Sequence, residues 1–497
     1  MYKLSIKGEE ASEKICRKPS HVKIFIYDEF DALTQTGNCI FEIDTSIKGK
    51  DNNILEAEWD KEVDFINSKL PTANFSFKFL DVDKKYNPDV NDGAWQEIEK
   101  QLPCCFYFGY TLEDDSIEWV KCGTYITTGE NEWDLSEFIP IITIHTKSII
   151  YFLTDEIDIS TINTATYYDM ISRGLEKIKE NNEFLEKEWV KVIIPEEFKN
   201  YSILRAFEEE SNYVVNELFQ LTAQASGRFL SVDRNGNIVF SPISTELKDF
   251  YLNYEKTNTP PSLTRYPFLK KFSLTGHASV HDENWTNTNV TDLASGNEVN
   301  TLHFQVSTSI ATQTYRIKTP PFFELKFHFV RYNDFNQDIG SDLALFAQNE
   351  YGTKTYADVW RFSRIENNIF EITFDNIHNS SNYYADISIL SKKWIEKNIE
   401  NIKVFSIDTI GESCSIDNPF ITNEDDVERV SSYLVDNLKM RNEYKGAENR
   451  GYPELDVGDM ITAETAYSDA LPVYLLSNKV KYDGALSGEC KYLLLQK

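Results

Sequence analysis

Long apolar stretches are missing from this sequence of 497 residues. No run approaches the roughly 18 apolar residues that a membrane-spanning helix needs. Residues 1–6 mix polar and apolar side chains, and Gly8, Glu9 and Glu10 follow, which is not the pattern of a signal peptide. We therefore expect a protein that is made and folded in a cytoplasm, without a signal peptide and without membrane insertion.

Basic side chains are scarce relative to acidic ones. The 50 Lys and Arg residues stand against 80 Asp and Glu residues, which gives a formal net charge of −30. A surface of that sign repels phosphate backbones and anionic membranes, so nucleic acid is not an expected partner. The charge is spread along the chain, which indicates solubility rather than disorder.

Cysteine is present in an odd number and without the spacing of a metal site. No CxxC pair occurs, which argues against a zinc site or a disulfide framework. We expect small apolar core residues in a reduced compartment. The seven cysteines are Cys16, Cys39, Cys104, Cys105, Cys122, Cys414 and Cys490.

The common catalytic motifs are missing as well. The chain has no GxSxG, no HExxH, no P-loop and no catalytic Cys–His phrase. A glycosidase needs two carboxylates, but with 80 acidic residues candidate pairs occur throughout and none stands out. We therefore predict no catalytic residues, no cofactor-binding residues and no metal ligands, and we expect that the protein is not an enzyme and needs no cofactor.

Three short segments bear some likeness to ion-binding sequences. His277 and His281 would lie on one face of a strand, but about 13 Å apart, which is too far for one ion. Residues 81–83 and 89–92 are rich in Asp but lack the spacing of an EF-hand. Residues 233–237 contain Asn-Gly between apolar runs, the strongest short signal of a hairpin. We interpret these segments as a strand, solvated turns and a hairpin turn.

Aromatic residues are abundant. They make up 13% of the chain, with 27 Tyr and 32 Phe, and hydrophobic residues in total make up 41%. Aromatics favour strands and protein interfaces, so the composition favours β structure. A single core stops growing well below this length, so we expect three or four domains.

Apolar runs and alternation predict a β domain in residues 1–150. In residues 74–80, Phe75, Phe77 and Phe79 fall on one face of a strand. Residues 81–93 collect Asp, Asn, Pro and Gly and predict a loop. The other predicted strands are residues 22–27, 40–43, 105–110, 117–122, 125–128 and 139–146.

Residues 155–255 are predicted to form a helix-rich unit with a β-hairpin. Apolar residues three or four apart predict helices over residues 166–189 and 203–225. Gly227 follows the second helix as a natural C-terminal cap. Residues 228–232 and 237–241 then form the two strands of the hairpin.

Two more domains follow. Residues 255–267 are rich in Thr, Pro and Asn and predict a linker, after which residues 270–410 predict an inserted β-sandwich. In that region Trp285, Trp360 and Trp394 are expected in the core rather than as sugar-binding platforms. Residues 418–497 predict a helix over 422–441, with Thr422 as N-cap, and then a C-terminal β domain.

Four groups of short phrases occur in a fixed order along the chain. They are residues 56–59, 70–73, 75–77 and 86–93; residues 105–110 and 118–126; residues 218–229 and 233–237; and residues 418–422, 453–461, 477–480 and 482–488. In this order the phrases resemble baseplate hub and tail-tip structural proteins of tailed phages and phage-derived tail-like particles. The resemblance covers about three fifths of the chain, and residues 276–410 lie outside it.

The resemblance implies a virion protein of a phage tail. The implied fold is α+β and mostly β, with tube-like β-barrels, a helix-hairpin unit and an inserted β-sandwich. The implied function is a structural baseplate component, hub or tail tip, that links the tail tube to peripheral baseplate or fibre proteins. The expected partners are further copies of this chain (a trimer, or alternatively a hexamer) and tail tube, distal tail and fibre proteins.

Two other functions stay open at this stage. The first is a carbohydrate-binding or receptor-binding tail protein, with residues 276–410 as the binding domain. The second is a cell-wall hydrolase, which hub proteins often carry behind their barrels. This chain reaches Lys497 directly after its last β segment, so we expect no such domain.

Overall fold

Strands make up 54% of the structure and helices 15%, so the chain is mostly β with a smaller helical part, as expected. The computed structural model describes residues 1–495 apart from 15–17, 48–52, 66–68, 90–92, 137, 160–165, 204–211, 245, 266–268, 307–311, 321, 334, 348–349, 357–359, 366–367, 376–382, 406–410 and 439–440. Among the helices of that described part, none has the length and apolar character to cross a membrane.

The N-terminal part of the chain folds into one antiparallel array of strands. Their order in space is β3-β4-β8-β6-β5-β1-β2. Phe75, Phe77 and Phe79 are at most 4% exposed, which confirms the predicted inward face of β4. The strands are β1 (His21–Asp31), β2 (Thr36–Asp44), β3 (Ile54–Glu62), β4 (Thr72–Leu80), β5 (Pro103–Thr111), β6 (Ile117–Thr127), β7 (Glu132–Asp134) and β8 (Ile141–Lys147).

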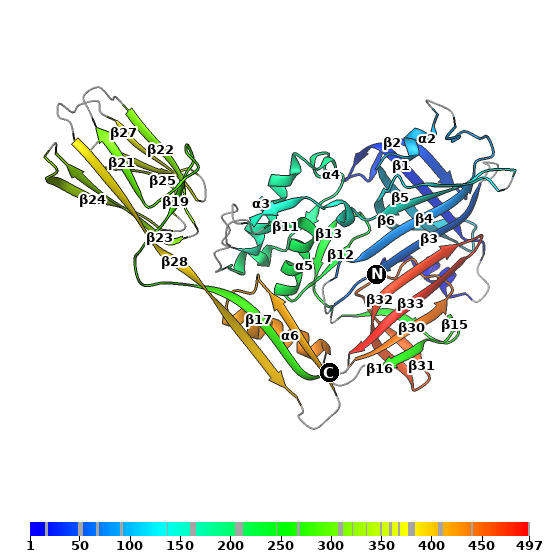
Figure 1. The fold of residues 1–497 in the computed structure, drawn as a ribbon. Helices are drawn as coiled ribbons and strands as arrows, with labels where there is room; N and C mark the ends of the chain where they lie inside the picture. The colour runs from blue at the N-terminus through cyan, green and yellow to red at the C-terminus, as the bar shows by residue number, and fades with distance from the viewer. Residues whose placement is uncertain are drawn as a thin grey trace.

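The C-terminal strands continue the same sheet. β32 (Ser468–Tyr482) runs antiparallel to β3, with Ala57 opposite Tyr482 and Trp59 opposite Val480. In Figure 1 the red C-terminal strands lie beside the blue N-terminal ones. The family resemblance led us to expect that the segment up to about residue 150 and the segment from about residue 450 pack near each other, since both look like pieces of tube-like barrels. The pairing of β3 with β32 confirms that they do. The remaining C-terminal strands are β30 (Arg441–Asn449), β31 (Met460–Thr465) and β33 (Leu486–Leu495).

The sheet is open at both ends. Its path runs from β15 (Thr257–Thr259) to β2, and the described strands do not close it into a barrel. The expected linker at residues 255–267 is wrong in part, because β15 and β16 (Ser262–Arg265) pair with β30. Backbone hydrogen bonds to the edge of an existing sheet outweigh the loop-like composition of this segment.

Helices and a hairpin pack against the inner side of the N-terminal strands. α3 (Tyr167–Lys179) and α4 (Glu183–Glu186) occupy the first predicted helix, and α5 (Val215–Ala225) occupies the end of the second. The prediction of one helix over 203–225 is wrong at β11 (Asn212–Val214), which pairs with β9 (Glu156–Asp158). Residues 204–211, in the first half of that predicted helix, lie outside the described residues.

The predicted hairpin is confirmed. β12 (Phe229–Val232) and β13 (Ile238–Ser241) are antiparallel, with Val232 opposite Ile238. The turn between them has Gly236 at φ +83°, a left-handed conformation that glycine adopts without strain. Gly227, the predicted cap of α5, has φ +69°. β10 (Val192–Ile193) adds a parallel third strand to the hairpin.

A β-sandwich with its own core stands apart from the rest of the molecule (Figure 1). Its core includes Phe327 and Phe329 from one sheet and Trp360, Phe370 and Phe374 from the other. The first sheet contains β21 (Thr301–Val306), β23 (Phe322–Tyr332), β24 (Asp338–Ala347) and part of β28 (Tyr383–Val404), and the second contains β19 (Val290–Asp292), β20 (Glu298–Val299), β22 (Thr312–Lys318), β25 (Gly352–Tyr356), β26 (Trp360–Arg364) and β27 (Ile369–Asp375).

Two long strands connect the sandwich to the body. β17 (Leu269–His281) pairs with the second half of β28, and β29 (Glu412–Asn418) runs parallel to β17. At the end of β17 that lies in the body of the molecule, the side chains of Phe272 and Leu274 are part of the main core. At about 3.3 Å per residue, the 22 residues of β28 span about 70 Å, so one strand belongs to both cores.

The last helix is capped one residue later than predicted, at Asn423 instead of Thr422. α6 (Glu424–Leu438) packs against β17 and β28, and its first turn is capped by Asn423, whose Oδ1 accepts the N–H of Asp426 at 2.7 Å. The expected cap, Thr422, is buried and donates to the carbonyl of Ser202 instead. The predicted end at Arg441 is also wrong, since Arg441 begins β30.

Candidate functional site

The outward face of the large sheet is polar where β3 crosses it. In β3, Trp59 and Lys61 point inward and are at most 2% exposed. Because successive side chains alternate across a sheet, the acidic residues between them point outward. These are Glu56, Glu58, Asp60 and Glu62.

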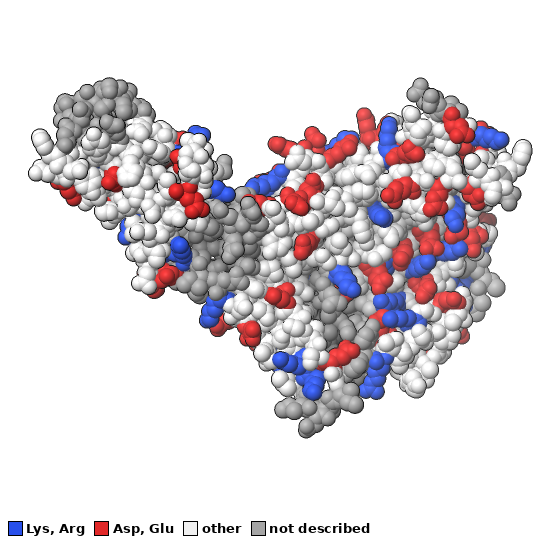
Figure 2. Space-filling model, viewed as in Figure 1, with Lys and Arg blue, Asp and Glu red and all other residues white. Residues whose placement is uncertain are grey.

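Lysines on neighbouring strands stand opposite these acids. Lys479 lies 2.7 Å from Glu58, and Lys491 lies 2.7 Å from Glu62. Figure 2 shows acidic and basic side chains interleaved over this part of the molecule. Exposed pairs of this kind contribute less than about 1 kcal/mol each, so they favour the strand register and leave a charged, hydrophilic face.

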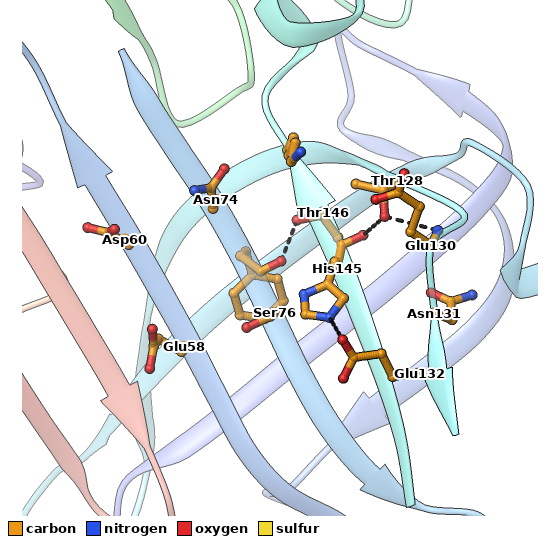
Figure 3. A pocket seen from close by; sticks show the side chains of 12 residues that line it. Glu58, Asp60, Asn74, Ser76, Thr128, Glu130, Asn131, Glu132, His145 and Thr146 are labelled. Atoms are coloured by element: carbon orange, nitrogen blue, oxygen red, sulfur yellow. Dashed lines mark hydrogen bonds and ion pairs between the residues drawn. The ribbon is translucent and has the colours of Figure 1, made fainter. Parts of the chain in front are cut away.

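A groove of about 540 Å³ runs over this face where β3, β4 and β8 meet the loop before β7 (Figure 3). His145 Nε2 lies 3.7 Å from Glu132 Oε1. The side-chain oxygens of Asn74 and Asn131 are buried without a hydrogen-bond partner. The groove therefore combines charged side chains with hydrogen-bond acceptors that lack a partner.

Asp60 is the groove's most perturbed carboxyl. Burial raises its pKa, Lys479 opposes the shift, and Glu62 and Glu58 add to it. Asp60 faces Asn74 on one neighbouring strand and Lys479 on the other. The carboxyl of Asp60 therefore faces a lysine on the paired strand and lies near the acidic side chains of Glu58 and Glu62.

The inward face carries a second polar cluster, which joins three distant parts of the chain. Lys61 Nζ lies 2.5 Å from Asp456 Oδ1, and Arg234 Nε lies 3.4 Å from Asp456 Oδ2. Burial disfavours the charged form of Asp456, but Lys61 and Arg234 outweigh it and lower the pKa of the carboxyl to about 2. We call Lys61, Arg234 and Asp456 the junction triad.

Arg234 lies at the tip of the predicted hairpin and reaches beyond it. Its guanidinium donates to the carbonyl of Lys121 at 2.7 Å and to the carbonyls of Glu454 and Leu455 at 3.0 and 3.2 Å. These bonds attach the helix-hairpin unit to β6 and to the turn before β31. Tyr110 Oη also donates to Glu454 Oε2 at 2.7 Å, so the same turn is held by β5.

The large sheet also presents an exposed edge strand. β2 pairs with β1 on one side and ends the strand path, and the side chains of Thr36, Asn38 and Cys39 are exposed. A strand with an unpaired side exposes backbone N–H and C=O groups that can pair with another chain. The opposite end of the path, β15, is three residues long.

The residues considered as ion ligands in the sequence form contacts within the fold. His277 lies 2.5 Å from Asp417 on the neighbouring strand, and the side chain of His281 lies outside the described residues. Asp81 is buried and accepts the backbone N–H groups of Lys85 and Tyr86. Within the described ranges no three His, Cys, Asp or Glu side chains gather as a metal site would require.

The other residues singled out in the sequence are those of the hairpin turn, the tryptophans and the cysteines. Asp233 accepts the N–H groups of Asn235 and Asn237 inside the hairpin turn, as interpreted. Trp360 is in the sandwich core, as expected. Trp285 is half-buried between Lys326 and Lys392, so the expectation of a core position is wrong for this residue, and the Trp394 side chain is not among those described. Cys104, Cys105, Cys122 and Cys490 are buried thiols outside any disulfide, and Cys16 is not described.

The junction triad was missed at the sequence level. One signal was present, because Lys61 follows Trp59 at the inward spacing of β3 and a lysine there needs a buried acid. Its partner Asp456 is 395 residues away, inside a turn that looked purely structural. No local pattern links the two positions.

Comparison with known proteins gives remote structural similarity and no sequence match. No protein-family model and no curated protein matches the chain. A tail protein from Neisseria meningitidis MC58 is similar with a TM-score of 0.47 at 7% identity, over 96% of this chain and 97% of that one. The 43 kDa tail protein of prophage MuSo2 from Shewanella oneidensis is similar with a TM-score of 0.45 at 9% identity, over 95% and 98%.

Proposed function

We propose that this chain is a structural component of a phage-type tail, placed in the baseplate as a hub or tail-tip protein. In this role it links the tail tube to peripheral baseplate or fibre proteins, and it is not an enzyme. The observation that carries the proposal is the single open sheet built from both ends of the sequence, with an exposed edge strand and a continuous polar face. The four phrases that resemble hub and tail-tip proteins lie largely in this same sheet and in the unit packed on it.

An open sheet supports assembly because its two edges are different strands, β2 at one end and β15 at the other. A contact between two different surfaces of identical copies repeats from copy to copy, and it forms a ring when the rotation between copies closes. Pairing at β2 is such a contact, since the other end of the strand path is built differently. We favour a trimer, with a hexamer as the alternative, and the barrel that one chain does not close is then completed by its neighbours.

The sandwich supports the linking role. It projects from the body on β17 and β28 and has a separate core, so it can contact a peripheral protein without disturbing the sheet (Figure 1). The polar face of the large sheet suits contact with solvent or with a hydrophilic neighbour. Both features are expected of a structural protein that contacts one neighbour through the large sheet and another through the sandwich.

Sedimentation velocity of the full chain tests this proposal. We expect an oligomer whose mass falls when lysines are placed on the β2 edge by Asn38→Lys and Cys39→Lys, because edge lysines oppose strand pairing. Ala294→Lys, in an exposed turn of the sandwich, is the matched control and leaves the mass unchanged. A wild-type chain that stays monomeric even with tail proteins added contradicts the proposal.

A further inference from the structure

The outward face of the sandwich has a hollow that plays no part in the proposed assembly through the large sheet. Its volume is about 600 Å³. It lies where β21, β28 and β23 run side by side, near the turn between β23 and β24. The residues that line it are His303, Phe304, Tyr332, Asn336, Tyr384 and Asp386.

Strand register places the polar and aromatic groups of the hollow in two adjacent rows. Tyr332 stands directly opposite Tyr384, and His303 stands directly opposite Asp386. Residues opposite each other in an antiparallel pair share a face, with Cβ atoms about 5 Å apart, and residues two apart on one strand share it too. The two tyrosines therefore lie next to the His–Asp pair on one surface.

The packing beneath makes this surface firm. Phe304 is 1% exposed and packs edge-on against Trp360, with the two ring centroids 5.0 Å apart. Ile387 is fully buried in the same core. The turn beside it is also fixed, because Asn333 Oδ1 accepts the N–H groups of Phe335 and Gln337 at 3.0 and 2.9 Å. Asn336 sits in this turn with φ +60° and is exposed.

The chemistry of the hollow matches a sugar. The Tyr384 side chain is 45% exposed, which leaves ring surface for the apolar C–H face of a pyranose. Asp386 accepts hydrogen bonds and holds His303 Nδ1 at 2.8 Å, and Asn336 can both donate and accept, as the hydroxyls around a sugar ring require. The exposed carboxylate of Asp386 and the chain's net charge of −30 disfavour an anionic ligand.

We propose that this hollow binds a neutral oligosaccharide, with Tyr332 and Tyr384 as the stacking surface and Asp386, His303 and Asn336 as the hydrogen-bonding groups. A pocket lined by aromatics with a few convergent polar groups is the usual form of a small-molecule site. The site does not depend on the tail proposal, because its residues belong to one sandwich of one chain.

The test uses the full-length protein and an array of neutral hexose and N-acetylhexosamine oligosaccharides together with acidic glycans. Binding to at least one neutral oligosaccharide is expected, followed by titration calorimetry with that compound. Tyr384→Ala and Asp386→Asn should each weaken binding about tenfold, since a stacked ring or a charged hydrogen bond is worth about that factor. Tyr467→Ala, which removes a tyrosine 87% exposed in the C-terminal region, should leave it unchanged.

Each other outcome overturns the inference. An array with no neutral ligand, or with acidic glycans only, contradicts the assigned ligand class. A neutral ligand whose affinity survives both Tyr384→Ala and Asp386→Asn binds elsewhere. Melting curves of the variants verify that the sandwich is intact, and oligomer formation by the same variants, measured separately, keeps this result distinct from the assembly proposal.

Discussion

Lys61 lies on the inward side of β3, two residues after Trp59, and is 2% exposed. A buried ammonium group is costly unless it is paired, and removing one member of such a pair is more damaging than never having had it. Asp456 provides the pairing, and Arg234 brings the hairpin to the same carboxylate. The junction triad thus joins β3, the hairpin tip and the turn before β31 at one point.

Replacing Lys61 by methionine should lower the free energy of unfolding by about 3 kcal/mol, because it leaves a largely buried carboxylate with one cation instead of two. Lys479→Met is the matched control. It removes an ion pair of 2.7 Å whose lysine is 40% exposed, and should cost less than about 1 kcal/mol. Urea denaturation of both variants measures the difference. Equal losses would show that the triad does not stabilise the fold.

The triad should also give the protein a defined acid sensitivity. The pKa of Asp456 is about 2 in the folded chain, against about 3.9 for an aspartate in an unfolded one. A carboxyl whose folded pKa is lowered stabilises the fold above its unfolded pKa, and this contribution is lost as the pH falls from about 4 to about 2. Melting temperatures of wild type and Asp456→Asn should therefore differ at pH 5 and converge toward pH 2. A constant difference contradicts this.

At the level of residues, side-chain alternation was predictable and long-range pairing was not. The inward positions of Phe75, Phe77 and Phe79 followed from a period of two and are confirmed. The same rule would have placed Lys61 inward, but the neighbouring acids Asp60 and Glu62 point to the outward face, and nothing in the local sequence identifies Asp456 as its partner. Electrostatic partners far apart in the chain become visible only once the sheet is assembled.

Among the elements, those whose signal is local were predicted correctly. The Asn235–Gly236 hairpin needs only its own turn chemistry, and it forms as expected. Residues 212–214 and 257–265 were assigned wrongly because each pairs with a strand distant in sequence, β9 and β30 respectively. Tertiary strand pairing overrides local helix spacing and loop composition.

The hairpin tip gives a test at this scale. Gly236 has φ +83°, and a Cβ there would lie 2.3 Å from the carbonyl oxygen of Thr124 in β6. Gly236→Ala should therefore cost the roughly 1–2 kcal/mol of a left-handed alanine and a further loss from moving the hairpin off the sheet. Gly484→Ala, at φ +98° with open space around it, should show the backbone cost alone. Equal melting temperatures of the two variants would mean that the hairpin tip is not closely docked.

The sandwich has a core of its own, separate from the core clusters of the body, and long strands join the two parts. The sandwich core is distinct from the main core, although β28 passes through both. The predicted divisions at 1–150, 155–255, 270–410 and 418–497 follow the sequence, whereas the large sheet combines strands from the first and last of them. Sequence order does not give that combination. It was expected only from the resemblance, because β3 and β32 are far apart in the chain and are brought together by the fold.

Calorimetry should resolve two unfolding transitions. Trp360 is fully buried in the sandwich core, and Trp360→Ala should destabilise that region by about 3–5 kcal/mol. Trp59 is equally buried in the main core, and Trp59→Ala should lower the other transition instead. If either variant lowers both transitions together, the two regions unfold as one cooperative unit.

The most direct test of the central claim is to locate this chain in purified tail particles by electron microscopy with a labelled antibody. The proposed function predicts label at the tip of the tail, at the end of the tube where the baseplate sits, in a fixed small number of copies per particle. Label along the whole tube, or particles that carry none of this chain, would contradict it.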